Sequence, residues 1–255
     1  MSLNLFDHLT QVLGWEACLL APLIVLLGYV IFGTVGFGAT ITNAPLLAHL
    51  LPLRFIVPLT LLLDLLAAAT LGTRARGRPD YGELKHIFPY VLLGLGVGLV
   101  LLIRLPERML LLLLGGFVLY AGLTGLTRRA GAGKVHRAWA IPAGIVGGVF
   151  SALYGTGGPI YTIYMSRRIA DMSAFRATMA RLILINGVVR LAMSAAAGLL
   201  AQDQLLVAAA LLAPVVAVGL YLGNRLHHAM PARRMLLFVN LLIIVNGAAL
   251  IVRAW

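Results

Sequence analysis

The sequence contains little charge, and very little of it is acidic. Only 11% of the 255 residues are charged, and Asp and Glu together number 8 against 20 Lys and Arg. Ordinary soluble domains are about 25% charged and about 45–50% apolar, whereas 61% of this chain is hydrophobic. A single soluble core does not need so much apolar surface. We therefore interpret the chain as an integral membrane protein.

Residues that carry catalysis or bind metals are also scarce. The one cysteine, Cys18, excludes an intramolecular disulfide. The sequence has no His-Glu-x-x-His, Gly-x-Ser-x-Gly, P-loop or Cys-x-x-Cys pattern, and His49 has no neighbouring ligand cluster. An intramembrane enzyme acting on lipid would need such groups at membrane depth. We therefore predict a protein that is not an enzyme and has no cofactor or metal.

The formal net charge of +12 raises the possibility of a nucleic-acid partner. However, the basic residues lie in short loops between apolar runs, which is typical of cytoplasmic loops of membrane proteins. We expect a lipid bilayer and no nucleic acid as the environment. Residues 1–20 contain no Lys or Arg, so they do not have the positive start of a cleaved signal peptide.

Several apolar runs are long enough to cross a membrane, for which a helix needs about 20 residues. Six of them occupy residues 55–73, 87–103, 107–127, 174–200, 204–222 and 234–252. Two further apolar regions, 17–50 and 138–166, are too long for one span, and glycines interrupt each of them midway. Each is therefore either one broken helix or a hairpin of two shorter arms.

The charges of the loops favour hairpins. The clearest basic loops fall within residues 74–85, 128–137, 167–176 and 225–234. If all four lie in the cytoplasm, as the positive-inside rule requires, residues 138–166 enter and leave on the cytoplasmic side. Residues 17–50 then enter and leave on the outer side. This arrangement predicts a multi-pass protein of the cell inner (plasma) membrane, with its N-terminus outside and the 128–137 linker in the cytoplasm.

The spans and hairpins divide into two similar halves. Residues 1–127 contain a hairpin and three spans that start outside, and residues 138–255 contain a hairpin and three spans that start inside. GFGATITNAPLL in the first half is similar to GTGGPIYTIYM in the second, and the last span of each half follows a proline, Pro106 or Pro231. The predicted fold is thus an all-α polytopic membrane protein with two inverted-topology repeats, an architecture that secondary transporters often use. Chance similarity between apolar stretches rich in Gly and Pro remains the alternative.

The paired stretches GFGATITNAPLLAHLLPLRFIVPLTLLLDLL and GTGGPIYTIYMSRR, the latter followed by AFRAT, resemble the sulfite exporter TauE/SafE family of membrane transporters. The resemblance covers about residues 20–250. It implies two related halves, each with a Gly-rich break followed by a proline. It also implies export or uptake of small sulfur-containing anions such as sulfite or organosulfonates. The first stretch departs from a denser Gly-Gly pattern, because Ala39 and Thr40 follow Gly38, and this departure concerns the substrate more than the fold.

The two breaks are suited to holding an anion. A hairpin tip at the membrane midplane presents the free backbone N–H groups and the positive dipole end of its returning helix. Glycines let a ligand approach that backbone closely, and Pro159 fits the first position of the returning helix. The alternative is that the glycines serve only close helix packing. The expected substrate-binding residues at the breaks are Gly36, Phe37, Gly38, Thr40, Asn43, Tyr154, Gly155, Thr156, Gly157, Gly158 and Tyr161.

Two charged residues lie in the middle of predicted spans, Asp64 in 55–73 and Arg190 in 174–200. Intramembrane charges are costly and are functional candidates by default. We expect the planar guanidinium of Arg190 to bind the anion, with Asn186 one helical turn away on the same face. Asp64 is a candidate for a coupling proton, although sodium coupling and simple uniport remain open. The structural alternative is an Asp64–Arg190 ion pair that joins the two halves.

These features together predict a secondary transporter that moves a small sulfur-containing anion by alternating access, with the anion held near the midplane. An anion channel or a non-transporting membrane scaffold is the rival interpretation. Arg181 lies nearer the cytoplasmic end of its span, where it can reach the interface and serve a structural role. A homodimer is possible, because dimers are the commonest closed assemblies.

Overall fold

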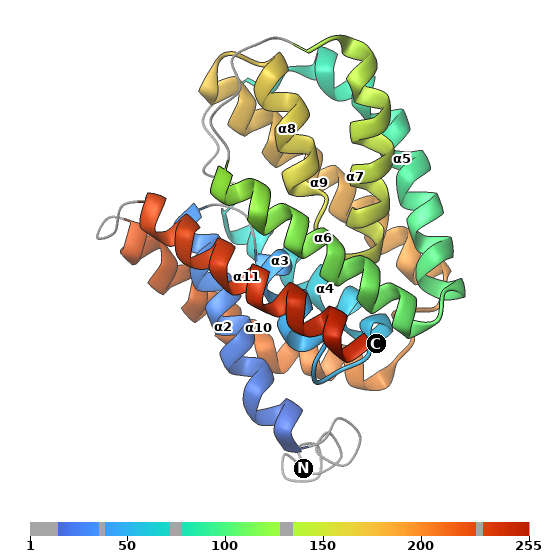
Figure 1. The fold of residues 1–255 in the computed structure, drawn as a ribbon, viewed down its shortest axis with the longest axis vertical. Helices are drawn as coiled ribbons and strands as arrows, with labels where there is room; N and C mark the ends of the chain where they lie inside the picture. Colours follow the sequence, from blue (N-terminus) through green and yellow to red (C-terminus); the bar gives the residue numbers. More distant parts are fainter. Residues whose placement is uncertain (1–14, 36–38, 72–77, 128–134, 228–231, 255) are drawn as a thin grey trace.

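The computed structural model describes residues 15–35, 39–71, 78–127, 135–227 and 232–254. Within these ranges the chain forms ten α-helices and one short 3-10 helix, and no strand (Figure 1). The all-helical fold predicted from the apolar runs is confirmed. The elements are α2 (Trp15–Val35), α3 (Ala39–Leu47), α4 (Leu53–Leu71), α5 (Tyr81–Arg104), α6 (Glu107–Thr127), η2 (Arg137–Trp139), α7 (Ala140–Tyr154), α8 (Gly158–Arg168), α9 (Met172–Ala196), α10 (Asp203–His227) and α11 (Ala232–Ala254).

Capping residues explain where the helices differ from the predicted spans. Helix α5 begins at Tyr81 rather than at 87, because the Asp80 side chain accepts a hydrogen bond of 3.0 Å from the backbone N–H of Glu83. Asp171 caps α9 in the same way through the N–H of Ala174, at 2.7 Å. Helix α9 ends at Ala196 rather than at 200, and Gly198 shortly after it has a φ of 72°. The apolar runs therefore predicted where the spans lie. The capping aspartates Asp80 and Asp171 determine where α5 and α9 begin.

Each of the two long apolar regions contains two helices. Region 17–50 contains α2 and α3, and residues 36–38 between them lie outside the described residues. Region 138–166 contains α7 and α8, which pack against each other on either side of Gly155-Thr156-Gly157. Gly155 ends α7 with a φ of 74°, and its backbone N–H bonds the Ser151 carbonyl at 2.8 Å. The second region is therefore a pair of packed arms and not one continuous helix.

The helices of the two halves are interleaved. Helix α5 packs along α7, α10 packs along α2, and α6 packs along α11. Glycines lie where the backbones meet: a Cβ built on Gly148 would be 2.9 Å from the Cα of Gly94, and one on Gly223 would be 2.9 Å from the Cα of Gly33. Small residues let membrane helices approach this closely. The first arm of each broken region, α2 or α7, consequently packs along a long helix from the other half of the chain.

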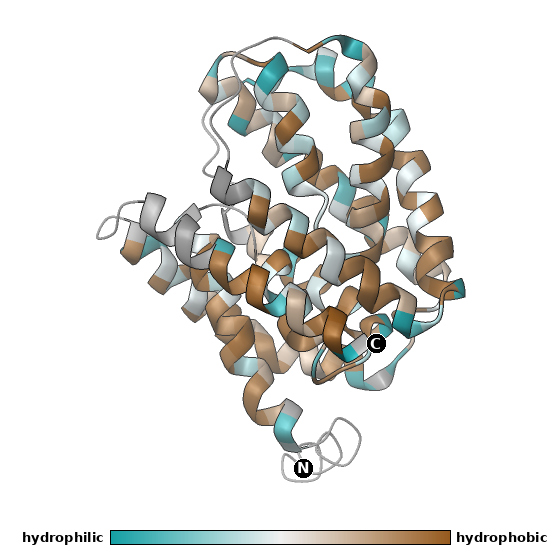
Figure 2. Ribbon diagram, in the orientation of Figure 1, coloured by the Kyte–Doolittle hydropathy of each residue, from teal (hydrophilic) through white to brown (hydrophobic). Residues whose placement is uncertain are grey.

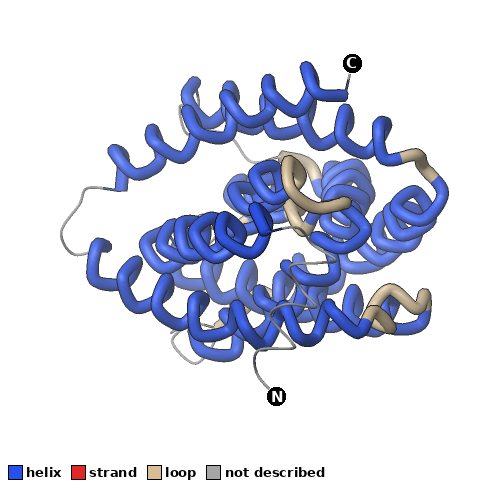
Figure 3. The backbone as a smooth tube through the Cα atoms, turned by 90° about the horizontal axis from the view of Figure 1, so that it is seen from below, coloured by secondary structure: helices blue, strands red, loops and turns tan. Residues whose placement is uncertain are grey.

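Helix α3 occupies the middle of the molecule. Eight of its nine residues are buried, and it contacts α2, α4, α6, α7 and α11. Figure 3, which views the chain from below, shows helix throughout most of the described part, with loops confined to connections. Helix α3, which follows residues 36–38 in the chain, is therefore surrounded by protein.

The outer surface is apolar. Leu93, Val97 and Val100 lie on one face of α5, and each is more than half exposed, while the opposite face packs on α7. In Figure 2 the most hydrophilic residues lie mainly near helix ends. Such a surface suits contact with lipid rather than with water. By length and composition, four helices of the described part can cross a membrane: Tyr81–Arg104, Glu107–Thr124, Met172–Ala196 and Gln204–Leu226.

The chain is thus a polytopic helical membrane protein. Two shorter apolar helical stretches, Cys18–Thr34 and Asn240–Arg253, accompany the four long ones. The start of the chain and residues 128–134 of the linker, on which the predicted orientation depends, lie outside the described residues. The positions of the N-terminus and linker relative to the membrane remain predictions.

Candidate functional site

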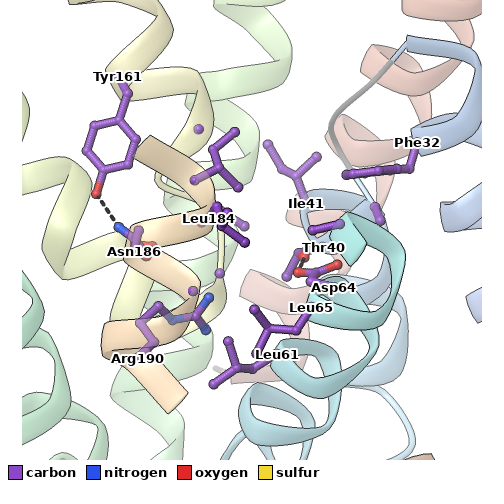
Figure 4. Close-up of a pocket in the computed structure, with 18 of the residues that line it drawn as sticks. Phe32, Thr40, Ile41, Leu61, Asp64, Leu65, Tyr161, Leu184, Asn186 and Arg190 are labelled. Carbon is purple, nitrogen blue, oxygen red and sulfur yellow. Dashed lines mark hydrogen bonds between the residues drawn. The ribbon is translucent and has the colours of Figure 1, made fainter. Parts of the chain in front are cut away.

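A cavity of about 110 Å³ lies between α3 and α4 on one side and α8 and α9 on the other, at the break between α7 and α8 (Figure 4). Pockets for drug-sized ligands are usually about 300–1,000 Å³, so this volume suits a small ion. Its polar lining residues are Thr40, Asp64, Ser151, Thr156, Tyr161, Asn186 and Arg190.

Asp64, on α4, supplies the negative charge of the cavity. The Tyr29 hydroxyl of α2 donates a hydrogen bond to one carboxylate oxygen at 2.8 Å. The Thr40 hydroxyl of α3 donates to the other oxygen. Hydroxyl donors from two different helices therefore satisfy both oxygens of this buried carboxylate, which offsets part of the cost of removing it from water.

Arg190, on α9, supplies the positive charge. Its side chain is buried, with 7% of the residue exposed, and points toward the Asp64 side of the cavity (Figure 4). Among the described residues, its buried Nη2 atom has no hydrogen-bond partner. Arg137 and Arg168 form ion pairs with Glu83, whereas the described residues Asp64 and Arg190 do not form one with each other. The structure therefore brings the two charges to one cavity without the direct contact that a structural ion pair would make.

Three polar side chains form a hydrogen-bonded chain beside Arg190. The Ser151 hydroxyl donates to Oδ1 of Asn186 at 2.7 Å, and Nδ2 of Asn186 donates to the Tyr161 hydroxyl at 3.0 Å. These bonds fix the orientation of the amide and link α7, α8 and α9. The cavity wall around Arg190 is consequently polar and held in one arrangement.

The break between α7 and α8 forms one end of the cavity. The positive end of the α8 dipole lies there. The N–H groups of Ile160 and Tyr161 bond the Gly157 carbonyl at 3.1 Å, and Pro159 has no N–H, so the Gly158 N–H is the group of the first turn that remains for a ligand. Gly158 and Pro159 line the cavity, and a Cβ on Gly158 would meet no atom within 4 Å. A Cβ on Gly155 would lie 2.6 Å from Cγ2 of Thr40 and 3.4 Å from Nη1 of Arg190. The second break thus directly contacts α3, the returning arm of the first hairpin.

Two of the residues expected at the second break do not line the cavity. The Tyr154 hydroxyl donates to the Leu110 carbonyl of α6 at 2.7 Å, and the side chain is fully buried there. Gly157 packs against α7, because a Cβ at this position would lie 2.5 Å from the Gly147 carbonyl oxygen. Packing accounts for both residues.

Of the residues expected to bind substrate at the first break, some line the cavity and others do not or lie outside the described residues. Thr40 lines the cavity. Asn43 is buried against Gly28, away from the cavity wall, and neither atom of its amide has a partner among the described residues. Gly36, Phe37 and Gly38 lie outside the described residues.

Sequence reasoning missed Tyr29 and Ser151. Each lies one or two turns before a break, but a single hydroxyl in an apolar helix has no distinguishing pattern. It also missed Glu83, which is 4% exposed and lies at the start of α5. Glu83 accepts hydrogen bonds from Arg168 at 2.6 Å, Arg137 at 3.2 Å and Tyr164 at 2.8 Å. This Glu83 cluster ties the start of α5 to the end of α8, away from the cavity.

A larger hollow of about 700 Å³ lies along α6, α7 and α8. Phe117, Tyr120, Trp139 and Phe150 are among the residues that line it, and Arg167 is its charged residue. An aromatic groove of this kind suits apolar groups such as lipid chains. The smaller cavity between the breaks is the better site for an ion.

The described fold and cavity define a helical membrane transporter: several spans surround a small, charged cavity at helix breaks. The family model described as sulfite exporter TauE/SafE matches residues 20–250, and the chain belongs to this family, as the sequence resemblance predicted. Members of the family are transporters and not enzymes.

The chain is also similar to "Probable inner membrane transporter protein TsaS" of Comamonas testosteroni. The two are 26% identical over 198 residues, which cover 77% of this chain and 83% of the relative. The similarity is consistent with a multi-pass protein of the inner membrane. No solved structure matches the chain.

Proposed function

We propose that the protein moves a small sulfur-containing oxyanion, such as sulfite or an organosulfonate, across the inner membrane by alternating access. The observation that carries this proposal is Arg190, which lines the cavity and whose buried Nη2 atom has no hydrogen-bond partner among the described residues. A buried cation without a hydrogen-bond acceptor is unfavourable. An oxyanion in the cavity would provide that acceptor.

The chemistry and size of the site support a sulfur oxyanion. A guanidinium presents two parallel N–H donors that match two oxygens of a sulfite or sulfonate group, as they match a carboxylate or a phosphate. The start of α8 adds the backbone N–H of Gly158 and the positive end of the helix dipole, because Pro159 has no N–H and those of Ile160 and Tyr161 bond the Gly157 carbonyl at 3.1 Å. A cavity of about 110 Å³ accepts such a group but not a large organic anion. The family description, sulfite exporter, agrees with this substrate class.

We also propose that residues 1–127 and 138–255 are the two inverted repeats that move against each other. Equivalent contacts recur in both halves: α5 covers α7 as α10 covers α2, with glycines at both crossings. Helices α6 and α11 pair with each other, and so do α4 and α9. Recurrent contacts of this kind support a pseudo-twofold axis that relates the two repeats. In secondary transporters built from such repeats, one repeat rocks against the other to open the site to each side of the membrane in turn.

Flux into proteoliposomes tests the proposal. Sulfite, methanesulfonate and acetate are offered to the wild-type protein, and saturable uptake of at least one sulfur oxyanion is expected. Flux that does not saturate indicates a channel. Absence of flux for every anion contradicts transport of this substrate class.

Arginine variants test the site itself. Arg190→Ala is expected to lower anion affinity by about 10–100-fold, the range of one or two charge-assisted hydrogen bonds. Arg181→Ala, an exposed arginine on the same helix, is the matched control and should bind like the wild type. Normal binding by Arg190→Ala would remove this residue from the site.

A further inference from the structure

We infer that a monovalent anion enters the cavity together with a proton, which binds to Asp64. This inference rests on the proposed function and specifies the coupling ion. It follows from the charges that line the cavity, from the hydrogen bonds around Asp64 and from the separation of Asp64 and Arg190.

The cavity has one full charge of each sign. Of its lining residues, Asp64 and Arg190 are those that are charged near neutral pH, and they come from opposite sides of the cavity (Figure 4). With both ionised, the cavity is neutral overall. A monovalent anion bound at Arg190 leaves one uncompensated negative charge in a buried site of low dielectric constant, where repulsion between like charges is strong. Protonation of Asp64 restores neutrality.

The surroundings of Asp64 accommodate a proton. Tyr29 from α2 and Thr40 from α3 donate to its two oxygens, and Arg190 from α9 and Tyr161 from α8 are the other ionisable groups among the residues that line the cavity. A hydroxyl can both donate and accept, so either hydroxyl can rotate to accept a hydrogen bond from a protonated carboxyl. The protonated form therefore keeps its hydrogen bonds without rearrangement of the helices.

The same surroundings suit a sodium ion less well. Hard cations take several oxygen ligands whose lone pairs face the ion. Here the hydrogen bonds gather only two hydroxyls, those of Tyr29 and Thr40, around the carboxylate among the described residues. No group of three or more His, Cys, Asp or Glu occurs among the described residues. The geometry thus favours a proton over a metal cation.

The proton balance is simple. A proton from the water on one side binds one oxygen of Asp64 as the anion binds Arg190, and both leave on the other side. No covalent bond of the anion changes. One negative and one positive charge cross together, so transport of a monovalent anion is electrically neutral.

Proton uptake on binding tests the inference directly. Purified full-length protein in detergent, in weak buffer with a pH-sensitive dye, is titrated with methanesulfonate. This anion stays fully ionised near neutral pH, so any proton taken up binds to the protein. We expect about one proton per bound anion at the pH of strongest linkage, and affinity that weakens by up to about tenfold per pH unit as the pH rises.

Two variants locate the proton. Asp64→Asn should bind methanesulfonate with no proton uptake and with affinity independent of pH. Asp171→Asn is the control: Asp171 is exposed and caps α9, and Asn caps equally well, so its proton uptake should equal that of the wild type. If Asp64→Asn does not fold, the wild-type titration still decides the question.

The possible failures are distinguishable. Binding of methanesulfonate by the wild type without proton uptake overturns the inference and leaves the proposed function intact. Loss of binding when sodium is replaced by N-methylglucamine at constant pH overturns it in favour of sodium coupling. No binding of any sulfur oxyanion contradicts both the inference and the proposed function.

Discussion

Asp64 on α4 and Arg190 on α9 face the same cavity, yet their hydrogen bonds differ. Both oxygens of Asp64 accept hydrogen bonds from hydroxyls of neighbouring helices, whereas Nη2 of Arg190 is buried without a partner among the described residues. The protein therefore satisfies the carboxylate internally and leaves the guanidinium with an unused donor. An anion-binding site is expected to have this distribution of hydrogen bonds, because the arginine then keeps a donor for the anion while the carboxylate needs no ligand.

The Glu83 cluster shows that the fold can satisfy a partly buried arginine. Nη2 of Arg168 lies 2.6 Å from Glu83, and Nη1 of the same side chain donates to the Val135 carbonyl at 3.1 Å. Arg168 thus has internal acceptors, whereas Nη2 of Arg190 has none within the part of the chain that the structure describes. The contrast indicates a structural role for Arg168, and it supports the ligand-binding role that we propose for Arg190.

Substitution at Gly155 should have the largest effect, because the two sides of the cavity meet there. Its φ of 74° disfavours any L side chain, and a Cβ would lie 2.6 Å from Thr40. Gly155→Ala should therefore destabilise the protein by about 2–5 kcal/mol, measured as thermal unfolding in detergent. Gly158→Ala is the control, because a Cβ there meets nothing within 4 Å. Equal stability of both variants would contradict the described break.

The two arginines should respond in opposite ways to loss of charge. Arg168→Gln should lower the free energy of unfolding by about 1–3 kcal/mol, because Glu83 loses its principal partner. Arg190→Gln should leave stability unchanged or raise it, because it removes a buried charge whose Nη2 atom has no acceptor among the described residues, and a proton on Asp64 keeps the cavity neutral. Anion affinity should fall. Thermal unfolding and methanesulfonate binding of each variant measure the two effects. A marked loss of stability in Arg190→Gln would instead favour a structural role for that residue.

Substitution of Tyr154 or Tyr161, in the second hairpin, should have the smallest effects on anion binding and stability. Tyr161→Phe removes the acceptor of Asn186 at the cavity wall, and a few-fold weaker binding is expected. Tyr154→Phe removes a bond to the Leu110 carbonyl, away from the cavity, so it should cost about 1 kcal/mol of stability and leave binding unchanged. Measuring both anion affinity and thermal stability distinguishes the two variants. Weaker binding by Tyr154→Phe together with normal binding by Tyr161→Phe would show that the binding site is not this cavity.

Much of the fold could be predicted because it depends on local properties of the chain. Apolar length determines whether a helix can span a bilayer, and glycines midway along the two longest apolar regions marked their breaks, although Gly115-Gly116 and Gly147-Gly148 lie inside continuous helices. The site was only partly predictable. Asp64, Asn186 and Arg190 were found because charges and amides are rare at membrane depth, and Thr40 was found because it follows the glycines of the first break. Tyr154 and Tyr161 were indistinguishable in sequence, because the direction of a side chain depends on which helix packs beside it.

By itself the sequence determined that the chain is helical and membrane-embedded, that two regions are broken, and that one acid and one arginine lie within spans. These properties follow from composition and spacing along the chain. The tertiary structure alone decided that Gly155 packs against Thr40, that Asp64 is satisfied by Tyr29 and Thr40, and that Glu83 gathers Arg137, Arg168 and Tyr164. Such contacts join residues far apart in sequence, and helix packing decides which of the buried polar groups meet a partner.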